Sequence, residues 1–385
     1  MQFSDLVPQF IQILADPQTK NILFLGCGGG YDFVHCLLLL PDLINSKKNL
    51  VIASNSFSNV SQLYTNFETV YQNPDNPSIV AKLIIPGQDS PHYGYIPEKL
   101  LCDFVSKQVP NANLTIYANN IWSFSHSENV EYLKGLITKH NIDTLIAVDG
   151  GSDSLMRGDE DSTGTIFEDT VSLAVCDTLK KECNLRNSFL LAFGLGVDRF
   201  HGVSDASSLR AVAELTRMGG FFGCSSINPN SNGLDLYVTF LKYVNEQKSG
   251  IIQTIVGSCI AASAIGQYGP YKYDVQPQLV PRDMKKIHKS AIEFFNLKED
   301  GSDYDTINNP RTSKETMYIW PLMSQIYAFD IETLAKRSFL VDCVREAKTY
   351  QIACNKMDEK IHELNLNHSL PIEEFPTSKQ MRCSN

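Results

Sequence analysis

The apolar positions of this chain form short continuous runs, separated by stretches with the spacing of helices. Most runs are uninterrupted, as expected for strands that are covered on both faces. The runs that predict strands are residues 21–25, 50–53, 81–85, 114–117, 144–148 and 189–193, with further apolar segments at 251–255, 317–320 and 326–329. Helical spacing covers residues 31–40, 128–140, 207–217 and 331–364. This alternation predicts a three-layer α/β fold with a doubly wound, mostly parallel, Rossmann-like sheet.

The length of the chain favours one large α/β domain. We expect it to cover residues 1–372 of the 385, with a long polar and aromatic loop excursion around residues 268–312. A structureless loop of that length within a compact domain is either functional or an excursion from it. The last residues, 373–385, predict a flexible tail.

Composition narrows the class of protein. The excess of 43 acidic over 33 basic residues, a net charge of −10, argues against a nucleic-acid-binding protein. The ten cysteines are scattered without a C-x-x-C pair, which predicts free thiols. The N-terminus does not fit a signal peptide and no apolar run is long enough for a membrane span, so we expect a cytoplasmic protein without a membrane partner. The oligomeric state stays open.

A first glycine-rich loop, "FLGCGGGYD" at residues 24–32, follows the first predicted strand. Glycines before a helix let the backbone approach a ligand and direct free N–H groups toward it. The candidate ligand-binding residues here are Gly26, Cys27, Gly28, Gly29, Gly30 and Asp32. A helix N-terminus would lower the pKa of the Cys27 thiol. A nucleophilic thiol needs a nearby base, however, and we expect His35, further along the helix, to face elsewhere.

The same loop resembles the first motif of class I methyltransferases, which holds S-adenosylmethionine. Those enzymes usually place an acidic residue at the end of the next strand, where it binds the ribose. Here that strand ends in "VIASNSFS", with Asn55 and no acid. A methyltransferase is therefore retained as an alternative.

A second loop, "VDGGSDSLMRGDEDSTG" at residues 148–164, holds five carboxylates and four glycines directly after a predicted buried strand. Asp149 and Asp153 are the candidate catalytic residues, because both emerge next to the strand end. The candidate ligand-binding residues of this loop are Gly150, Gly151, Ser152 and Glu160. The alternative is that these residues only form turns and caps, as we expect for Asp159 and Asp161.

The two loops together resemble the uncharacterised domain-of-unknown-function family 1152. Its acidic pattern falls on Asp149, Gly151, Asp153, Leu155, Gly158, Glu160 and Asp169. A third element, "FGLGVDRFHG" at residues 193–202 with Asp198, resembles a later strand end of the family. The resemblance spans about residues 21–335 and implies no activity, since none is assigned to the family.

These strand ends predict one cleft. In open α/β sheets ligands bind beyond the carboxyl ends of the strands, so Asp32, Asp149, Asp153 and Asp198 are expected to converge there. Close carboxylates recruit a cation or bind protons tightly, which leaves a divalent metal open as a cofactor. Asp169 could instead only cap a helix.

We therefore expect a small-molecule-binding α/β protein. The leading hypothesis is an enzyme acting on a small polar metabolite with hydroxyl or amine groups, nucleoside-like, through hydrolysis or lyase chemistry. The alternatives are an S-adenosylmethionine-dependent methyltransferase and a non-catalytic metabolite-binding protein.

Overall fold

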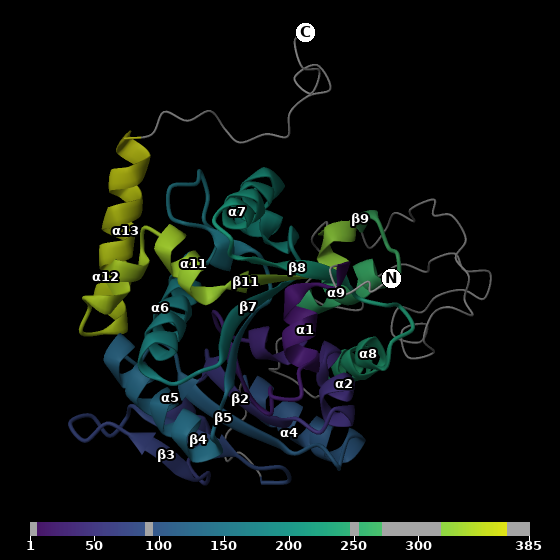
Figure 1. The fold of residues 1–385 in the computed structure, drawn as a ribbon. Helices are drawn as coiled ribbons and strands as arrows, with labels where there is room; N and C mark the ends of the chain where they lie inside the picture. The colour runs from purple at the N-terminus through teal and green to yellow at the C-terminus, as the bar shows by residue number, and fades with distance from the viewer. Residues whose placement is uncertain (1–5, 89–94, 247–253, 272–316, 368–385) are drawn as a thin grey trace.

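The protein is built around a nine-stranded sheet, seen edge-on in Figure 1. The computed structural model describes residues 6–88, 95–246, 254–271 and 317–367. Across the sheet the strands follow the order β3 (Thr69–Gln72), β4 (Val80–Ile84), β5 (Leu114–Asn120), β2 (Asn49–Ser56), β1 (Asn21–Gly26), β6 (Thr144–Asp149), β7 (Asn187–Phe193), β11 (Gln325–Asp330) and β8 (Phe221–Ser226). The neighbouring strands β5, β2, β1, β6 and β7 pair in parallel. The pairs at both edges are antiparallel.

The continuous apolar runs are explained by burial on both faces of the sheet. In β1, Ile22 and Phe24 pack into the hydrophobic core on one face, whereas Leu23 and Leu25 pack into the core on the other. Alternate side chains of a strand point to opposite faces, so a strand between two helical layers needs apolar residues at every position.

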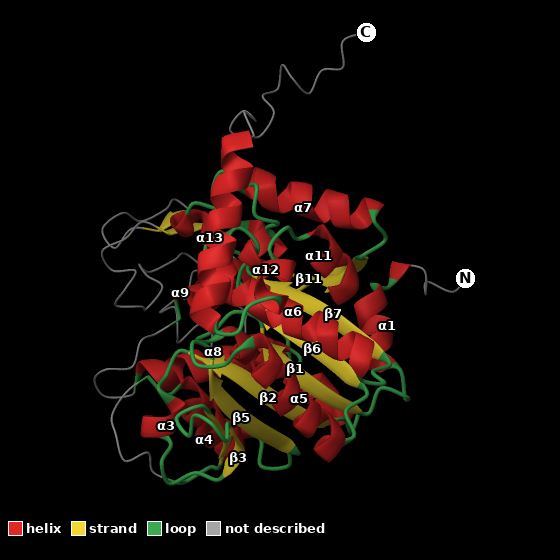
Figure 2. Ribbon diagram, turned by 90° about the vertical axis from the view of Figure 1, so that its left-hand side faces the viewer, coloured by secondary structure: helices red, strands yellow, loops and turns green. Residues whose placement is uncertain are grey.

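Helices cover both faces of the sheet and complete three layers (Figures 1 and 2). One layer contains α1 (Gln9–Ala15), the 3₁₀ helix η2 (Asp32–Leu38), α2 (Leu40–Asn45), α3 (Val60–Leu63), α4 (Pro97–Gln108), α8 (Asn232–Asn245), α9 (Ile255–Ala264) and η6 (Pro321–Ser324). The other contains α5 (His126–His140), α6 (Ile166–Glu182), α7 (Asp205–Arg217), α11 (Ile331–Arg337), α12 (Val341–Arg345) and α13 (Tyr350–Asn367). The short 3₁₀ helices η3 (Asp153–Leu155) and η4 (Val197–His201) follow β6 and β7, and β9 (Gly269–Tyr271) pairs with β10 (Met317–Ile319) in a separate sheet.

The α/β fold and the parallel centre of the sheet are confirmed, but several expectations about elements were wrong. The edge strands β3 and β8 were not predicted, and the sheet is mixed because its edges are antiparallel. Residues 31–40 form a 3₁₀ helix followed by the start of α2 instead of one α-helix. The pattern at 331–364 is divided among three helices. Ile255 begins α9, so the described end of the 251–255 segment is helical.

The strand order reverses next to β1. From β1 the parallel strands continue to β2 and β5 on one side, and the chain then returns to place β6 and β7 on the other side. Loops that leave β1 and β6 therefore diverge and leave a crevice between them, where ligands of doubly wound sheets bind.

Some expectations concern residues outside the described ranges. These include most of the loop excursion at 268–312 and the tail at 373–385. Nine cysteines are free thiols, as predicted, and the tenth, Cys383, lies outside the described residues. Among the described helices, none combines the length and the apolar character that a membrane span requires.

Candidate functional site

A cavity of about 540 Å³ lies at the carboxyl ends of the parallel strands. The segments after all five of these strands contribute to its lining, through residues Asp32, Phe57, Trp122, Gly150 and Asp198. Its volume is in the range of small-molecule sites. The parallel centre of the sheet thus brings together residues that are far apart in the sequence.

The two glycine-rich loops meet in this cavity, as predicted. Strands β1 and β6 pair directly, with Gly26 opposite Val148, and the Cys27 amide donates a hydrogen bond to the Val148 carbonyl at 2.7 Å. Residues 28–30 from the first loop line the same cavity as Gly150 and Asp153 from the second.

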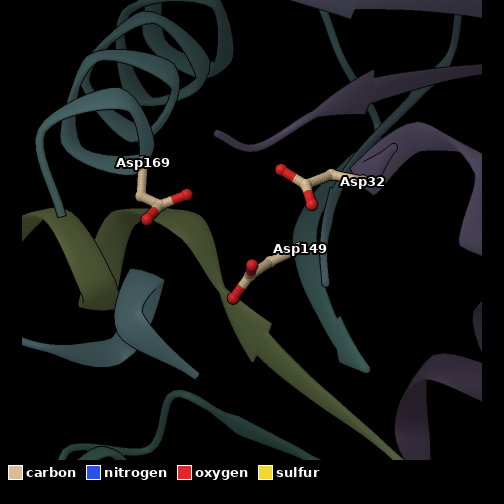
Figure 3. A group of neighbouring side chains, drawn as sticks. All are labelled: Asp32, Asp149 and Asp169. Atoms are coloured by element: carbon tan, nitrogen blue, oxygen red, sulfur yellow. The ribbon is translucent and has the colours of Figure 1, made fainter. Parts of the chain in front are cut away.

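Three aspartates from three different elements point toward one another (Figure 3). Asp32 begins η2, Asp149 ends β6 and Asp169 lies in the first turn of α6. One carboxylate oxygen of each lies within 4.8 Å of the others, a distance at which two unit charges repel by about 3.5 kcal/mol at an effective dielectric constant of about 20. The fold therefore maintains a close group of carboxylates that destabilises it when all three are charged.

The absence of a side chain at Gly28 allows two of these carboxylates to approach. A Cβ atom at this position would lie 2.5 Å from both Asp169 Oδ1 and Asp32 Oδ2. Its φ of +100° also disfavours any other residue. Gly28 is thus required by the close approach as well as by the turn.

Burial raises the pKa of each of these three carboxyl groups well above its ordinary value. The negative charge of the neighbouring Asp153 adds to this effect. For Asp32, hydrogen bonds from the backbone N–H groups of Gly150 and Gly29 oppose the rise in pKa. The carboxyl groups consequently retain protons to a higher pH than exposed aspartates.

The other two predicted aspartates also line the cavity, and each has a hydrogen-bonding partner. Asp153 Oδ2 accepts bonds from the backbone N–H of Thr165 at 3.0 Å and from its hydroxyl at 2.7 Å. Asp198 Oδ2 accepts bonds from the backbone N–H of Ser152 at 2.5 Å and from its hydroxyl at 3.1 Å. Ser152 and Gly151 are not among the cavity-lining residues; a Cβ at Gly151 would lie 2.6 Å from Asp198 Oδ2.

His35 lines the cavity, contrary to the expectation that it faces elsewhere. Its side chain is 1% exposed, and its Nδ1 shares a hydrogen bond of 2.7 Å with the Tyr237 hydroxyl. The other ring nitrogen, Nε2, is buried without a hydrogen-bond partner and would lie 2.4 Å from a Cβ at Gly150. Burial lowers the pKa of His35 to about 3, so the imidazole is neutral.

One wall of the cavity is aromatic. The rings of Phe57 and Trp122 stack with centroids 5.3 Å apart and an interplanar angle of 10°. Trp122 is 49% exposed, which is unusual for a large apolar side chain. A Cβ at Gly29 would lie 2.2 Å from Phe57, so the glycine allows the ring to lie directly on the loop.

Cys27 has no accessible thiolate. Its side chain is buried and its Sγ lies 3.7 Å from the Asp169 carbonyl oxygen. Burial, with the neighbouring carboxylates as further causes, raises the pKa of the thiol, so the expected lowering at a helix N-terminus was wrong.

Asn55 stands where a methyltransferase would carry its ribose-binding acid. Its side chain forms hydrogen bonds with other residues of the protein. Its amide donates to the Gly26 carbonyl at 3.0 Å and to the Ser172 hydroxyl at 2.9 Å. Its carbonyl oxygen accepts a bond from Asn119 at 3.2 Å. Asn55 therefore stabilises the start of the first glycine-rich loop through its bond to Gly26.

Glu160 is not one of the cavity-lining residues, and its hydrogen bonds hold the backbone of its own loop. Its carboxylate accepts bonds from the backbone N–H groups of Arg157 at 3.0 Å and Gly158 at 2.9 Å. Arg157 also pairs with Asp159 at 2.7 Å, and Arg337 lies 3.8 Å from Glu160. This second half of the acidic loop is balanced by arginines.

Several cavity residues were missed by the sequence analysis or assigned another role. Asp169 was considered as a helix cap, and its place in the family pattern was the available signal. Phe57 and Trp122 were not singled out, because an exposed aromatic residue in a loop has no periodic pattern.

Comparison with known proteins finds a similarity to one family over part of the chain. No curated protein and no solved structure matches the chain. A family model described as "Protein of unknown function (DUF1152)" matches residues 104–259. The match contains the acidic loop, Asp169 and Asp198, whereas the first glycine-rich loop precedes it. The match therefore confirms the resemblance to DUF1152, an uncharacterised family, over residues 104–259.

Proposed function

We propose that the protein is an enzyme that binds a small polar metabolite in this cavity and acts on it through its aspartates. The observation that carries the proposal is the convergence of five aspartates on one cavity whose described lining contains no lysine or arginine. Buried carboxylates with a raised pKa and no basic partner are more typical of functional sites than of structural ones.

The chemistry of the walls indicates the class of metabolite. Carboxylates accept hydrogen bonds from hydroxyl and amine groups, and the Phe57–Trp122 pair offers a surface on which a planar ring can stack. The reversal of strand order beside β1 is also the place where doubly wound, Rossmann-like sheets bind nucleotides. A nucleoside-like compound combines the ring and the hydroxyl groups.

Asp149 and Asp153 are proposed as the acid–base pair. Because burial raises the pKa of Asp149, this carboxyl group is suited to donate a proton. Asp153 uses Oδ2 to accept the two bonds from Thr165, so we assign the contact with the ligand to its other oxygen. Such a pair can support hydrolysis or elimination.

The methyltransferase alternative receives less support. Its ribose-binding acid is replaced by Asn55, whose amide donates to Gly26 and Ser172.

A thermal-shift screen followed by mass spectrometry tests the proposal. We expect nucleosides to raise the melting temperature more than ribose does, because ribose lacks the ring. Asp149→Asn and Asp153→Asn should each lower turnover at least a hundredfold, which is the usual contribution of a general acid or base. Asp161→Asn, an exposed change in the same loop, is the matched control. Recovery of the bound metabolite unchanged would indicate a binding protein, and a response to S-adenosylmethionine alone would indicate a methyltransferase.

A further inference from the structure

We propose that Asp32, Asp149 and Asp169 form a binding site for one hard divalent cation, such as Mn²⁺ or Mg²⁺. The inference concerns the same cavity as the proposed function, but it does not require that the protein be an enzyme. A bound cation keeps Asp149 ionised, so the role of Asp149 as proton donor belongs to the cation-free state of the site.

The spacing of the three carboxylates fits a shared cation. Their oxygens lie within 4.8 Å of one another. Two oxygens on one ion are separated by at most twice the ion–oxygen distance, about 4.2 Å for Mg²⁺ and about 5 Å for Ca²⁺. A cation would therefore need only a small inward movement of these side chains. An oxygen-only ligand set is the one that such ions prefer.

The backbone is arranged so that the carboxylates can meet. Gly28 separates Asp32 and Asp169, and any side chain there would overlap both carboxylates. Backbone N–H groups of Gly29 and Gly150 bond to Asp32 and orient it. These features fix the position of the ligands before an ion arrives.

His35 provides the second, independent observation. Its buried Nε2 has no partner and faces the position of Gly150, beside Asp32 Oδ1. A buried polar atom without a partner is rare in folded proteins, and a bound ligand is one common explanation. The neutral imidazole can bond to a water molecule held by the cation, and it adds no positive charge to the site.

Asp153 and Asp198 also line the cavity, but they do not belong to the group whose oxygens lie within 4.8 Å of one another. Asp153 and Asp198 already accept two hydrogen bonds each, from Thr165 and from Ser152. They add negative potential that attracts a cation, and their free oxygens remain for its water or for a metabolite.

Titration of the protein with Mn²⁺, followed by the electron paramagnetic resonance signal of the free ion, tests the inference without any metabolite. We expect one Mn²⁺ per chain, displaced by Mg²⁺. Asp149→Asn and Asp169→Asn should each weaken binding at least tenfold, whereas Asp161→Asn should bind like the unmodified protein. Asp32→Asn provides a third, independent ligand change, and circular dichroism confirms that each variant is folded.

Absence of Mn²⁺ binding at millimolar concentration would overturn the inference, as would an affinity in all three ligand variants equal to that of the unmodified protein. The outcome of this titration can be distinguished from the outcome of the metabolite experiment. Metabolite turnover without cation binding would reject the cation site alone. Cation binding without any metabolite response would support the site and leave the proposed enzyme without support.

Discussion

The two halves of the acidic loop between β6 and α6 balance their charges in different ways. In the first half, Asp149 and Asp153 face a cavity whose described lining has no lysine or arginine. In the second half, Asp159 and Glu160 lie beside Arg157. In this loop Asp159 and Glu160 are thus accompanied by an arginine, whereas Asp149 and Asp153 are not.

The same difference is seen in the effect of the surroundings on proton binding. Glu214 belongs to the arginine-balanced group, and hydrogen bonds from Arg210 and Arg337 outweigh burial and hold its pKa below the ordinary value. Burial raises the pKa of Asp149 instead. Substitutions in the two groups should therefore change stability in opposite directions.

The largest expected effect is that of Arg337→Met. Arg337 is buried, donates to Glu214 at 2.9 Å and to the Leu155 carbonyl, and lies close to Glu160. Its removal breaks a partly buried ion pair with Glu214 and leaves the Leu155 carbonyl without this donor, which should lower the free energy of unfolding by about 3–5 kcal/mol. Urea denaturation measures this loss.

The control for this change is Lys336→Met on the neighbouring position. Lys336 pairs with Glu332 at 2.6 Å at the surface, where solvent screens the pair, so its loss should leave the free energy of unfolding nearly unchanged. Similar effects of the two variants would contradict the structural role of Arg337.

A smaller effect of opposite sign is expected for Asp149→Asn. At pH 8 with a chelator present, removal of one carboxylate charge should raise the free energy of unfolding by about 1 kcal/mol, because repulsion within the group decreases. The matched change in the other half, Glu160→Gln, should instead destabilise the protein by about 1–3 kcal/mol, because it weakens charged hydrogen bonds.

The pH dependence follows from the raised pKa of Asp149. The folded state binds this proton more tightly than the unfolded chain, so the stabilisation is fully present below the ordinary pKa of about 3.9 and is lost as the pH rises through the folded value. The advantage of Asp149→Asn should therefore grow from acid to alkaline pH. An advantage that is constant with pH would contradict this explanation.

The smallest expected effect on stability is that of Trp122→Leu. The indole is half exposed and stacks on Phe57, so its loss should lower the free energy of unfolding by about 1 kcal/mol or less. Nucleoside binding, measured by calorimetry, should weaken about tenfold, while Mn²⁺ affinity should not change. Loss of Mn²⁺ affinity would show that the aromatic wall and the carboxylates are not separate parts of the site.

The centre of the fold could be predicted from the sequence because its strands are buried on both faces. Continuous runs such as those in β1 and β6 indicate such strands when turn residues and helical stretches flank them. The edge strand β8 was missed because it is only partly buried and lacks that pattern.

Part of the site could also be predicted, because some of its residues follow these buried strands directly. Glycines and aspartates at strand ends are visible in the sequence, and Asp32 and Asp149 do meet in the cavity. Asp169 enters from the start of α6, and its orientation depends on how that helix packs across β6. His35 faces the cavity because its segment forms a 3₁₀ helix, whose side chains follow a different period from that of an α-helix.

The direct pairing of β1 with β6 also determines when the site can exist during folding. Gly26 and Val148 are neighbours in the sheet but are separated in the sequence by β2, β3, β4, β5 and the helices between them. Contacts of this kind have a high contact order and form slowly, since a long loop must close first. A nascent chain that ends before β6 contains the first glycine-rich loop but not the acidic loop that completes the cavity. Such a chain cannot bind the ligand. Ligands of the cavity can therefore stabilise the finished protein, but they cannot guide the early steps of its synthesis.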